Sequence, residues 1–283
     1  IQDATDALED TRMKYRYLDL RRPSMQKNLI MRHKATIAAR NYLDERGFIE
    51  IETPYLGKST PEGARDFLVP SRIHEGSFYA LPQSPQLYKQ LLMVAGFDKY
   101  FQIAKCFRDE DLRADRQLEF TQIDVEMSFI DEEDVYEVLE GLLKRVWKEV
   151  LNQEIQTPFM RMEYDDAMNH YGSDKPDTRF EMLLQNMTEW AKKVEFGVFQ
   201  NQILLGNVVK GIIVHHAATK YSRKEIDRLT LVAKKYHASG LAWLKYENHL
   251  LTGSIAKFLT EENQKEFIET YQLQNDDLIL IVS

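Results

Sequence analysis

The chain has 283 residues, of which 43% are hydrophobic, so it can bury the cores of two ordinary domains and is not expected to be disordered. Its 37 basic and 45 acidic residues give a net charge of −8, which argues against a protein that binds nucleic acid through overall positive charge and leaves room only for contacts by local Arg and Lys residues. Cys106 is the single cysteine, which excludes an intrachain disulfide, and there is no signal peptide or membrane-spanning apolar run, so we expect a cytoplasmic protein.

The first predicted element is an amphipathic helix over residues 25–46. Gly47 follows it and can adopt the left-handed conformation that commonly ends a helix. Residues 48–54 then alternate and predict a short strand, which Pro54 closes because proline cannot donate to a strand ladder. The apolar stripe of the helix consists of Ile30, Ile37, Ala38, Tyr42 and Leu43.

A second helix is predicted to begin near residue 85. Ser84 is a suitable N-cap, and Pro85 suits the first helical position. Gln86 and Lys89 lie three residues apart, so they share one face of this helix. A single lysine on a helix is usually solvated, so this spacing by itself assigns no function.

Residues 100–129 predict two strands joined by a charged loop at 111–119. Arg108 and Glu110 lie two residues apart at the end of the first strand and so point the same way, whereas Cys106 is expected to be a small packing residue. The second strand alternates between an apolar face for a core and a polar face that either meets solvent or lines a site. Its polar face carries Phe120, Gln122, Asp124, Glu126 and Ser128, and its apolar face carries Thr121, Ile123, Val125, Met127 and Phe129.

A third helix follows the hairpin. Asp131 can cap it, and its apolar stripe runs to about Leu151 and is expected to be core. Turn-forming residues at 169–177 place a domain boundary near residue 175. The stripe consists of Val135, Leu139, Leu142, Leu143, Val146 and Val150.

From residue 180 the pattern changes to an α+β module without a catalytic constellation. Ser222 and Glu225 form a capping box ahead of a helix, and strands are predicted at residues 240–245 and 278–282. The apolar residues of the helix are Ile226, Leu229, Ala233 and Tyr236.

Three short strings in the hairpin carry a resemblance to a known family. Residues 107–110 read FRDE, residues 116–117 read RQ and residues 119–122 read EFTQ. This pattern resembles motif 2 of the class II aminoacyl-tRNA synthetases, and the helix and strand over residues 25–54 resemble motif 1. Nearly the whole chain is similar to the bacterial aspartyl branch of that family. The resemblance implies a ligase that activates L-aspartate with ATP, accompanied by Mg²⁺, and passes it from aspartyl-adenylate to tRNA.

The resemblance also implies which residues contact ATP. Adenylate formation builds negative charge on the α-phosphate, and the fork of an arginine can bind such a group with two bonds. Arg108 is therefore expected to be catalytic, clamping the α-phosphate and the aspartate carboxylate, and Phe120 is expected to stack on adenine. The implied ATP-binding residues are Arg108, Asp109, Glu110, Gln117 and Phe120.

The implied aspartate site begins in a turn. By composition, residues 60–67 are a Pro/Gly turn with surface charges. In the family this turn supplies Glu62 for the substrate ammonium, which needs an anionic or polar acceptor once desolvated. Lys89 resembles the lysine that reads the β-carboxylate; it favours aspartate, because a lysine substrate needs an acid and asparagine has no side-chain charge. The implied aspartate-binding residues are Glu62, Ser84, Gln86, Lys89, Arg108 and Asp124.

The same resemblance implies an α+β fold in which helices flank an incomplete antiparallel sheet and a second, smaller α+β domain is inserted. Residues 1–24 are expected to be a linker from an N-terminal anticodon-binding domain. Residues 25–175 are expected to form the N-terminal part of the catalytic domain, and residues 176–283 an inserted domain also found in a tRNA-dependent amidotransferase. Motif 1, with Pro54 at the interface, implies a homodimer.

The sequence departs from the family in two respects. The third motif, which follows the inserted domain and supplies a second ATP-binding arginine, is not present, so the 283-residue chain by itself is expected to be inactive. A Gly-rich stretch expected near residues 217–219 is also missing, which puts any role of that turn in doubt. The adjacent His215 and His216 would face opposite sides of a strand, so no metal site is expected there.

Two alternatives to the synthetase interpretation stay open. One is a non-catalytic dimerisation or binding module derived from the same fold. The other, which is weaker, is hydrolysis by the carboxylates of Asp124 and Glu126, for which the sequence implies no nucleophile and acid geometry. Within the synthetase interpretation, it stays open whether aspartate alone or also asparagine tRNA is charged.

Overall fold

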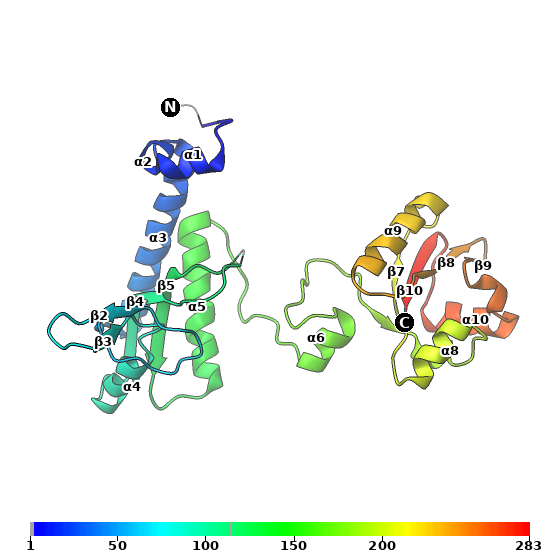
Figure 1. Cartoon of the computed structure of the whole chain (residues 1–283). Coiled ribbons are helices and arrows are strands. Elements are labelled where there is room, and N and C mark those ends of the chain that lie inside the picture. Colours follow the sequence, from blue (N-terminus) through cyan, green and yellow to red (C-terminus); the bar gives the residue numbers. More distant parts are fainter. Residues whose placement is uncertain (1–2, 114) are drawn as a thin grey trace. The chain divides into compact units, whose positions relative to one another are not determined.

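The computed structural model describes residues 3–113 and 115–283, and the chain forms two compact units, residues 1–160 and residues 161–283 (Figure 1). This division lies earlier than the boundary near residue 175 that the turn residues predict. The reason is that α6 (Tyr164–His170) belongs to the second unit: the carbonyl of His170 accepts from the Leu184 amide at 2.8 Å, and Lys210 donates to the Asn169 carbonyl at 3.0 Å.

The first unit consists of helices on a small sheet. In the sheet, β1 runs parallel to β4, and β4 pairs with β5 in antiparallel fashion; β2 and β3 form a separate antiparallel pair. The elements are α1 (Glu9–Lys14), α2 (Arg16–Asp19), α3 (Pro23–Glu45), β1 (Ile49–Glu50), β2 (Leu68–Pro70), β3 (Phe78–Ala80), α4 (Gln86–Val94), β4 (Lys99–Phe107), β5 (Glu119–Met127) and α5 (Glu132–Leu151).

Helices α3 and α5 share one hydrophobic core with the apolar face of the sheet. The predicted stripe of α3 is partly wrong, since Tyr42 and Leu43 lie in this core whereas Ile30 and Ile37 are 54% and 39% exposed. Gly141 allows their close approach, because a Cβ at this position would lie 2.0 Å from the hydroxyl oxygen of Tyr42. Gly47 ends α3 with a φ of 79°, which confirms the predicted helix end. The buried core consists of Ala39, Tyr42, Leu43, Phe48, Phe101, Val138 and Leu142, and Val125, Met127 and Val146 pack against it.

Helix α5 begins as the sequence predicts, with Asp131 accepting the amides of Glu133 and Asp134 in a capping box. The predicted stripe is partly wrong, since Val138 and Leu142 are buried whereas Leu139 is 41% exposed. The face that α5 presents to the core therefore includes Val138, Leu142 and Val146 but not Leu139.

Three other local predictions need correction. The strand expected over residues 48–54 is limited to β1. Ser84 is not the cap of α4, because Pro85 takes that position and the Ser84 hydroxyl bonds Glu62 instead. Phe129 does not continue the apolar face of β5: the strand ends at Met127, and Phe129 has a φ of 57° and is 96% exposed.

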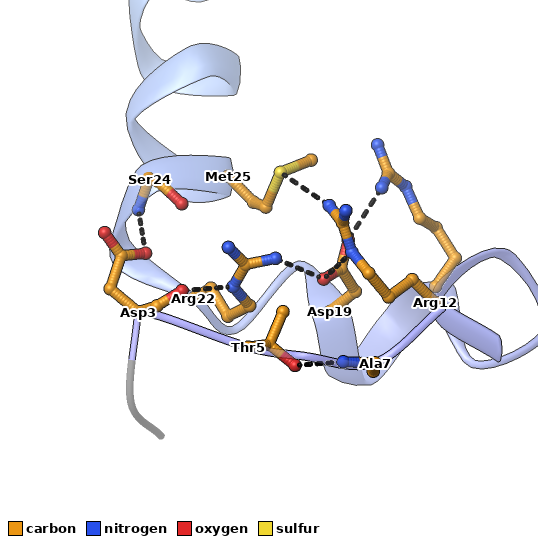
Figure 2. A network of polar contacts seen from close by, with 9 residues as sticks. Asp3, Thr5, Ala7, Arg12, Asp19, Arg22, Ser24 and Met25 are labelled. Carbon is orange, nitrogen blue, oxygen red and sulfur yellow. Dashed lines mark hydrogen bonds and ion pairs between the residues drawn. The ribbon is translucent and has the colours of Figure 1, made fainter. Parts of the chain in front are cut away.

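A buried carboxylate fastens the N-terminal segment to the start of α3 (Figure 2). Asp19 accepts bonds from Arg12 at 3.0 Å, Arg16 at 2.8 Å and Arg22 at 2.9 Å. The bonds from Arg12 and Arg22 hold the pKa of Asp19 down at about 2. Arg22 and Ser24 also bind Asp3, so the predicted linker is, from residue 3 onward, folded against the start of α3.

The second unit has a sheet with the strand order β6-β7-β10-β8-β9, in which every neighbouring pair is antiparallel. Besides α6, its elements are β6 (Gln185–Asn186), α7 (Thr188–Ala191), α8 (Gly197–Leu204), β7 (Lys210–Val214), α9 (Arg223–Lys235), β8 (Ala242–Glu247), β9 (Leu250–Gly253), the 3₁₀ helix η1 (Ala256–Phe258), α10 (Glu261–Thr270) and β10 (Asp277–Val282).

Strand β10 is buried on both faces. Ile279 and Ile281 belong to a core with Trp190 and Phe267, whereas Leu278 on the other face packs with Ile226 of α9 and its neighbours. The capping box of Ser222 and Glu225 at the start of α9 is confirmed, and so is the strand at residues 278–282.

Two features of this unit differ from the predictions. Tyr236 is 75% exposed and is not part of the stripe that α9 buries. Strand β7 ends at Val214, so His215 and His216 lie in a turn and not in a strand; His215 contacts the buried Asp277 with its Nδ1 atom at 2.9 Å from Oδ1. The α+β class is confirmed for the chain as a whole. Among the described helices, none is both long enough and apolar enough to cross a membrane.

Candidate active site

The polar face of the β4–β5 hairpin is the floor of the candidate site. The antiparallel register places Gln102 opposite Asp124 and Cys106 opposite Phe120. Because side chains alternate along a strand, the even-numbered residues of β4 share one face with the polar residues of β5. This face is the one opposite the core that α3 and α5 build.

Lys89 of α4 lies over this face. It is the buried residue of that helix, with 9% of its surface exposed. Its Nζ atom lies 2.9 Å from Oδ1 of Asp124 and 3.1 Å from Oε2 of Glu126. The face of α4 that carries Lys89 therefore faces β5, and Lys89 forms ion pairs with two carboxylates of that strand. The two carboxylates on this strand face are paired with Lys89, so their presence does not require a hydrolytic role.

The cluster carries one positive and two negative charges. Burial by itself lowers the pKa of Lys89, but the bonds and charges of Asp124 and Glu126 outweigh it, so the pKa is raised and the ammonium stays charged. Burial, with a smaller contribution from Glu126, also raises the pKa of Asp124 despite the bond from Lys89. Both pKa values are raised because two carboxylates share one ammonium: the negative charges stabilise the charged lysine, and burial beside Glu126 destabilises the charged form of Asp124.

Asp124 has unused bonding capacity. Its Oδ2 atom is buried and has no hydrogen-bond partner among the described residues. Nearby, the hydroxyls of Tyr100 and Thr53 both donate to Oε1 of Gln102 at 2.9 Å. Burial and the charge of Asp124 raise the pKa of Tyr100. A buried acceptor without a donor is costly in a folded protein, so this oxygen suits a ligand that brings a donor.

Glu62 lies in the turn after β1, as predicted, and is held by hydroxyls on both oxygens. Thr60 donates to its Oε1 at 3.1 Å, and Ser84 donates to its Oε2 at 2.8 Å. A hollow of about 100 Å³ opens beside it, lined among others by Pro54, Glu62, Ser84 and Tyr88. Pro54 therefore lines this hollow, and its predicted place in a dimer interface stays a prediction.

Arg108 stands where β4 ends. Its guanidinium carbon lies 5.0 Å from the centre of the Phe120 ring, and its Nε donates to the Gln83 carbonyl at 3.4 Å. A cation over an aromatic face is a favourable pair. The structure thus brings together the two residues predicted to hold the α-phosphate and the adenine.

The other predicted ATP residues lie in and around the charged loop. Glu110 forms an ion pair with Arg116 at 3.3 Å, and Asp109 is tied by its backbone to Arg65, whose carbonyl accepts the Asp109 amide at 3.0 Å. Gln117 is exposed in the loop. Gln86 is half-buried on α4, on the face it shares with Lys89.

Cys106 is buried on the polar face of the hairpin, opposite Phe120. Burial raises the pKa of its thiol to about 11, and the remaining influences come from the charges of Arg108, Asp124, Glu62 and Lys89. Each of these charges contributes less than burial does. Cys106 itself is a packing residue with its Sγ 3.2 Å from Gln122, as predicted.

Sequence reasoning missed Gln83, Gln102 and Tyr100, which are buried and hydrogen-bonded in this region. No spacing rule identifies them, because a buried polar residue is defined by partners far away in the sequence. Alternation along β4 could at most have placed Tyr100 and Gln102 on the same face as the polar residues of β5.

The comparison with protein families defines the class. A family model described as "tRNA synthetases class II (D, K and N)" matches residues 8–277. The chain therefore belongs to the class II tRNA synthetase family.

Several curated members of this family that are similar to the chain are aspartate–tRNA ligases. The chain is 58% identical over its full length to the aspartate–tRNA ligase of Streptococcus agalactiae (serotype Ia strain), covering 48% of that protein. It is 59% identical to that of Macrococcus caseolyticus, covering 48%, and 58% identical to that of Lactobacillus johnsonii, covering 46%. The chain thus spans about half the length of the curated relatives it matches.

Two solved structures are similar in fold. The asparaginyl-tRNA synthetase of Entamoeba histolytica, in complex with asparaginyl-adenylate, has a TM-score of 0.52 at 18% identity, covering 99% of this chain and 67% of that one. The asparaginyl-tRNA synthetase of Pyrococcus horikoshii, also complexed with asparaginyl-adenylate, has a TM-score of 0.52 at 15% identity, covering 98% and 68%. The likeness supports the class II fold.

Proposed function

We propose that this chain provides the amino-acid and ATP contacts of an aspartate–tRNA ligase. The single observation that carries the proposal is Lys89, a buried cation held 2.9 Å from Asp124 on the helix that follows Gln83 and Ser84, the two residues to which Arg108 and Glu62 are hydrogen-bonded. The identity to curated aspartate–tRNA ligases supports it.

In this proposal the two charged ends of aspartate meet opposite charges. The substrate ammonium binds Glu62, whose carboxylate is already oriented by Thr60 and Ser84. The β-carboxylate binds Lys89 and shares it with Asp124 and Glu126. Because those two carboxylates repel a third, the site binds a β-carboxylate only where its bonds to Lys89 compensate for that repulsion.

Arg108 would serve the reacting atoms. An oxygen of the α-carboxylate of aspartate forms a bond to the α-phosphorus of ATP, the bond to the bridging oxygen breaks, and pyrophosphate leaves with that electron pair. The negative charge on the α-phosphate grows along this path, and a fixed guanidinium stabilises it. Phe120 would offer the adenine ring the face that Arg108 does not cover, since the Arg108 guanidinium carbon lies 5.0 Å from the centre of the Phe120 ring.

Mg²⁺ is proposed to arrive with ATP. Within residues 3–113 and 115–283, no group of three or more His, Cys, Asp or Glu side chains is placed to hold a metal ion. The chain's own residues therefore fit a metal brought by phosphates better than a preformed metal centre.

Transfer to tRNA, assembly as a homodimer and a cytoplasmic location complete the proposal. Exposed apolar residues on α3, among them Leu29 and Ile30, support an interface on that helix. The assignment of residues 1–24, 25–175 and 176–283 to linker, catalytic part and inserted domain stays a prediction.

The test is ATP–pyrophosphate exchange by the full-length gene product with aspartate, asparagine and lysine offered separately. The proposal expects exchange with aspartate alone, because Lys89 meets a carboxylate. Equal exchange with asparagine would overturn the assignment of Lys89. The 283-residue chain, run alongside, is expected to be inactive; a full-length product that binds tRNA but shows no exchange would favour the non-catalytic module.

A further inference from the structure

Both polar atoms of the Gln83 side chain are hydrogen-bonded, although the residue is not itself one of the charged groups of the site. It is 2% exposed. Its Oε1 accepts the amide of Ala64 at 3.0 Å, and its Nε2 donates to the carbonyl of Ala64 at 2.9 Å and to Oδ1 of Asp66. The side chain thus binds both backbone groups of one residue, as a neighbouring strand would.

This pairing fixes the turn that carries Glu62. Ala64 lies two residues after Glu62, and Ser84, the residue next to Gln83, donates to the Glu62 carboxylate at 2.8 Å. Asp66 is also bonded by the Ser59 hydroxyl, so the turn is closed from its other end. Gln83 and Ser84 therefore hold the turn at three residues, which are Glu62, Ala64 and Asp66.

The backbone of the same segment reaches the other side of the site. The carbonyl of Gln83 accepts from Nε of Arg108 at 3.4 Å, and the carbonyl of Pro82 accepts the amide of Phe107 at 2.9 Å. Gln83 consequently lies between the acid at one end of the site and the arginine at the other.

We propose that Gln83 is a positioning residue that holds Glu62 at a set distance from Arg108. The inference rests on the proposed function, because these are the groups assigned to the aspartate ammonium and to the reacting phosphate. Gln83 touches neither substrate. It acts through the turn: its side chain sets the position of Glu62, and its backbone borders Arg108.

The chemistry of the site requires an amide at this position. A carboxylate accepts the Ala64 amide but has no donor for the Ala64 carbonyl, and it would stand directly against the carboxylate of Asp66. Gln83→Glu is therefore nearly isosteric yet breaks the contacts that close the turn. Gln90→Glu, the same change on the exposed face of α4, is the matched control.

The experiment measures the turn and the kinetics in the full-length gene product. In Gln83→Glu, backbone hydrogen exchange in a peptide covering residues 59–67 is expected to be about tenfold faster, and the KM for aspartate about tenfold higher, with the KM for ATP within about twofold. Gln90→Glu is expected to leave all three unchanged. Circular dichroism checks that each variant is folded.

A second variant tests the named contact. Adding Asp66→Asn to Gln83→Glu removes the carboxylate repulsion and restores a donor across the pair. We expect this double variant to recover most of the protection from exchange and most of the aspartate affinity. Asp66→Asn alone keeps an acceptor for Ser59 and is the reference for the double variant.

Three outcomes would overturn the inference: exchange at residues 59–67 equal to that of Gln90→Glu, equal rises in the KM values for aspartate and ATP, or no recovery in the double variant. If the unchanged protein shows no aspartate-dependent pyrophosphate exchange, the proposed function fails. The hydrogen-exchange comparison still decides whether Gln83 holds the turn, so the two failures are distinguishable.

Discussion

The strands β5 and β10 show how differently the two units use a sheet. Strand β5 has an apolar face on the core of α3 and α5 and a polar face on which Asp124 and Glu126 meet Lys89. Beyond the buried Asp277 at its start, strand β10 is buried on both faces by apolar side chains, with Leu278 and Ile279 fully covered. The polar face of the first unit's sheet therefore holds three charged side chains together, whereas the central strand of the second unit buries one carboxylate, Asp277, at its start and apolar side chains along the rest of its length.

The difference between the two strands separates residues expected to act on substrate binding from residues expected to act on stability. Burying carboxylates beside a single lysine costs desolvation energy that is recovered only through good geometry or a ligand. An apolar core has no such requirement, and its loss is felt in folding alone. We therefore expect changes in the second unit to alter the free energy of unfolding, and changes on the polar face of the first unit to alter substrate binding and rate.

The largest effect is expected from Phe267→Ala in the second unit. Phe267 is fully buried and its ring centre lies 4.3 Å from that of Trp190. Removing it should cost ~3–5 kcal/mol of unfolding free energy, measured by urea unfolding of the 283-residue chain with tryptophan fluorescence. Phe180→Ala, at an exposed position in the same unit, should cost less than about 0.5 kcal/mol; equal losses would contradict the comparison.

Arg108→Ala should leave folding intact and remove catalysis. Losing one fixed charge donor from the reacting phosphate is expected to slow aspartate-dependent pyrophosphate exchange by ~10²–10³-fold. The measurement uses the full-length gene product, with Arg72→Ala at an exposed position as control. A rate within about threefold of the unchanged protein would remove Arg108 from the catalytic role.

Lys89→Met should separate the two substrates. A charged hydrogen bond lost from a buried site is worth ~1.5–3 kcal/mol, so aspartate binding should weaken by that amount while ATP binding changes little. Separate titrations of the two ligands check this. Because the change leaves Asp124 and Glu126 without their cation, thermal unfolding must accompany the titrations, and equal losses for both ligands in a folded variant would refute the assignment.

The smallest effect concerns pH. The pKa of Asp19 is held at about 2, below its ordinary value of 3.8, by bonds from Arg12 and Arg22. A lowered pKa in the folded state gives stability that is fully present above about pH 3.8 and is lost as the pH falls through about 2. Asp19→Asn should therefore lower the melting temperature above pH 4 and make little difference near pH 2.

The control for this experiment is Asp6→Asn, an exposed position in the same segment. Melting curves of both variants and of the unchanged chain are recorded by circular dichroism between pH 2 and pH 5. A constant difference between Asp19→Asn and the unchanged chain across this range would show that the arginines do not act through the charge of Asp19.

The sequence by itself determined the features that depend on nearby residues. The capping boxes at Asp131 and Ser222, the helix end at Gly47 and the two faces of β5 follow from side chains within a few positions of one another. Periodicity states which residues share a face, and the motif strings in the hairpin pointed to Arg108 and Phe120, which the structure brings to 5.0 Å.

Only the tertiary structure decided which faces are covered and which polar groups meet. Leu139 fits the stripe of α5 but is exposed, because α3 packs on the side of α5 that carries Val138, Gly141 and Leu142. Lys89 finds Asp124 across 35 positions of sequence, and Gln83 finds Ala64 across 19. A side chain's hydrogen-bond partner depends on how distant segments pack, and no local pattern contains that information.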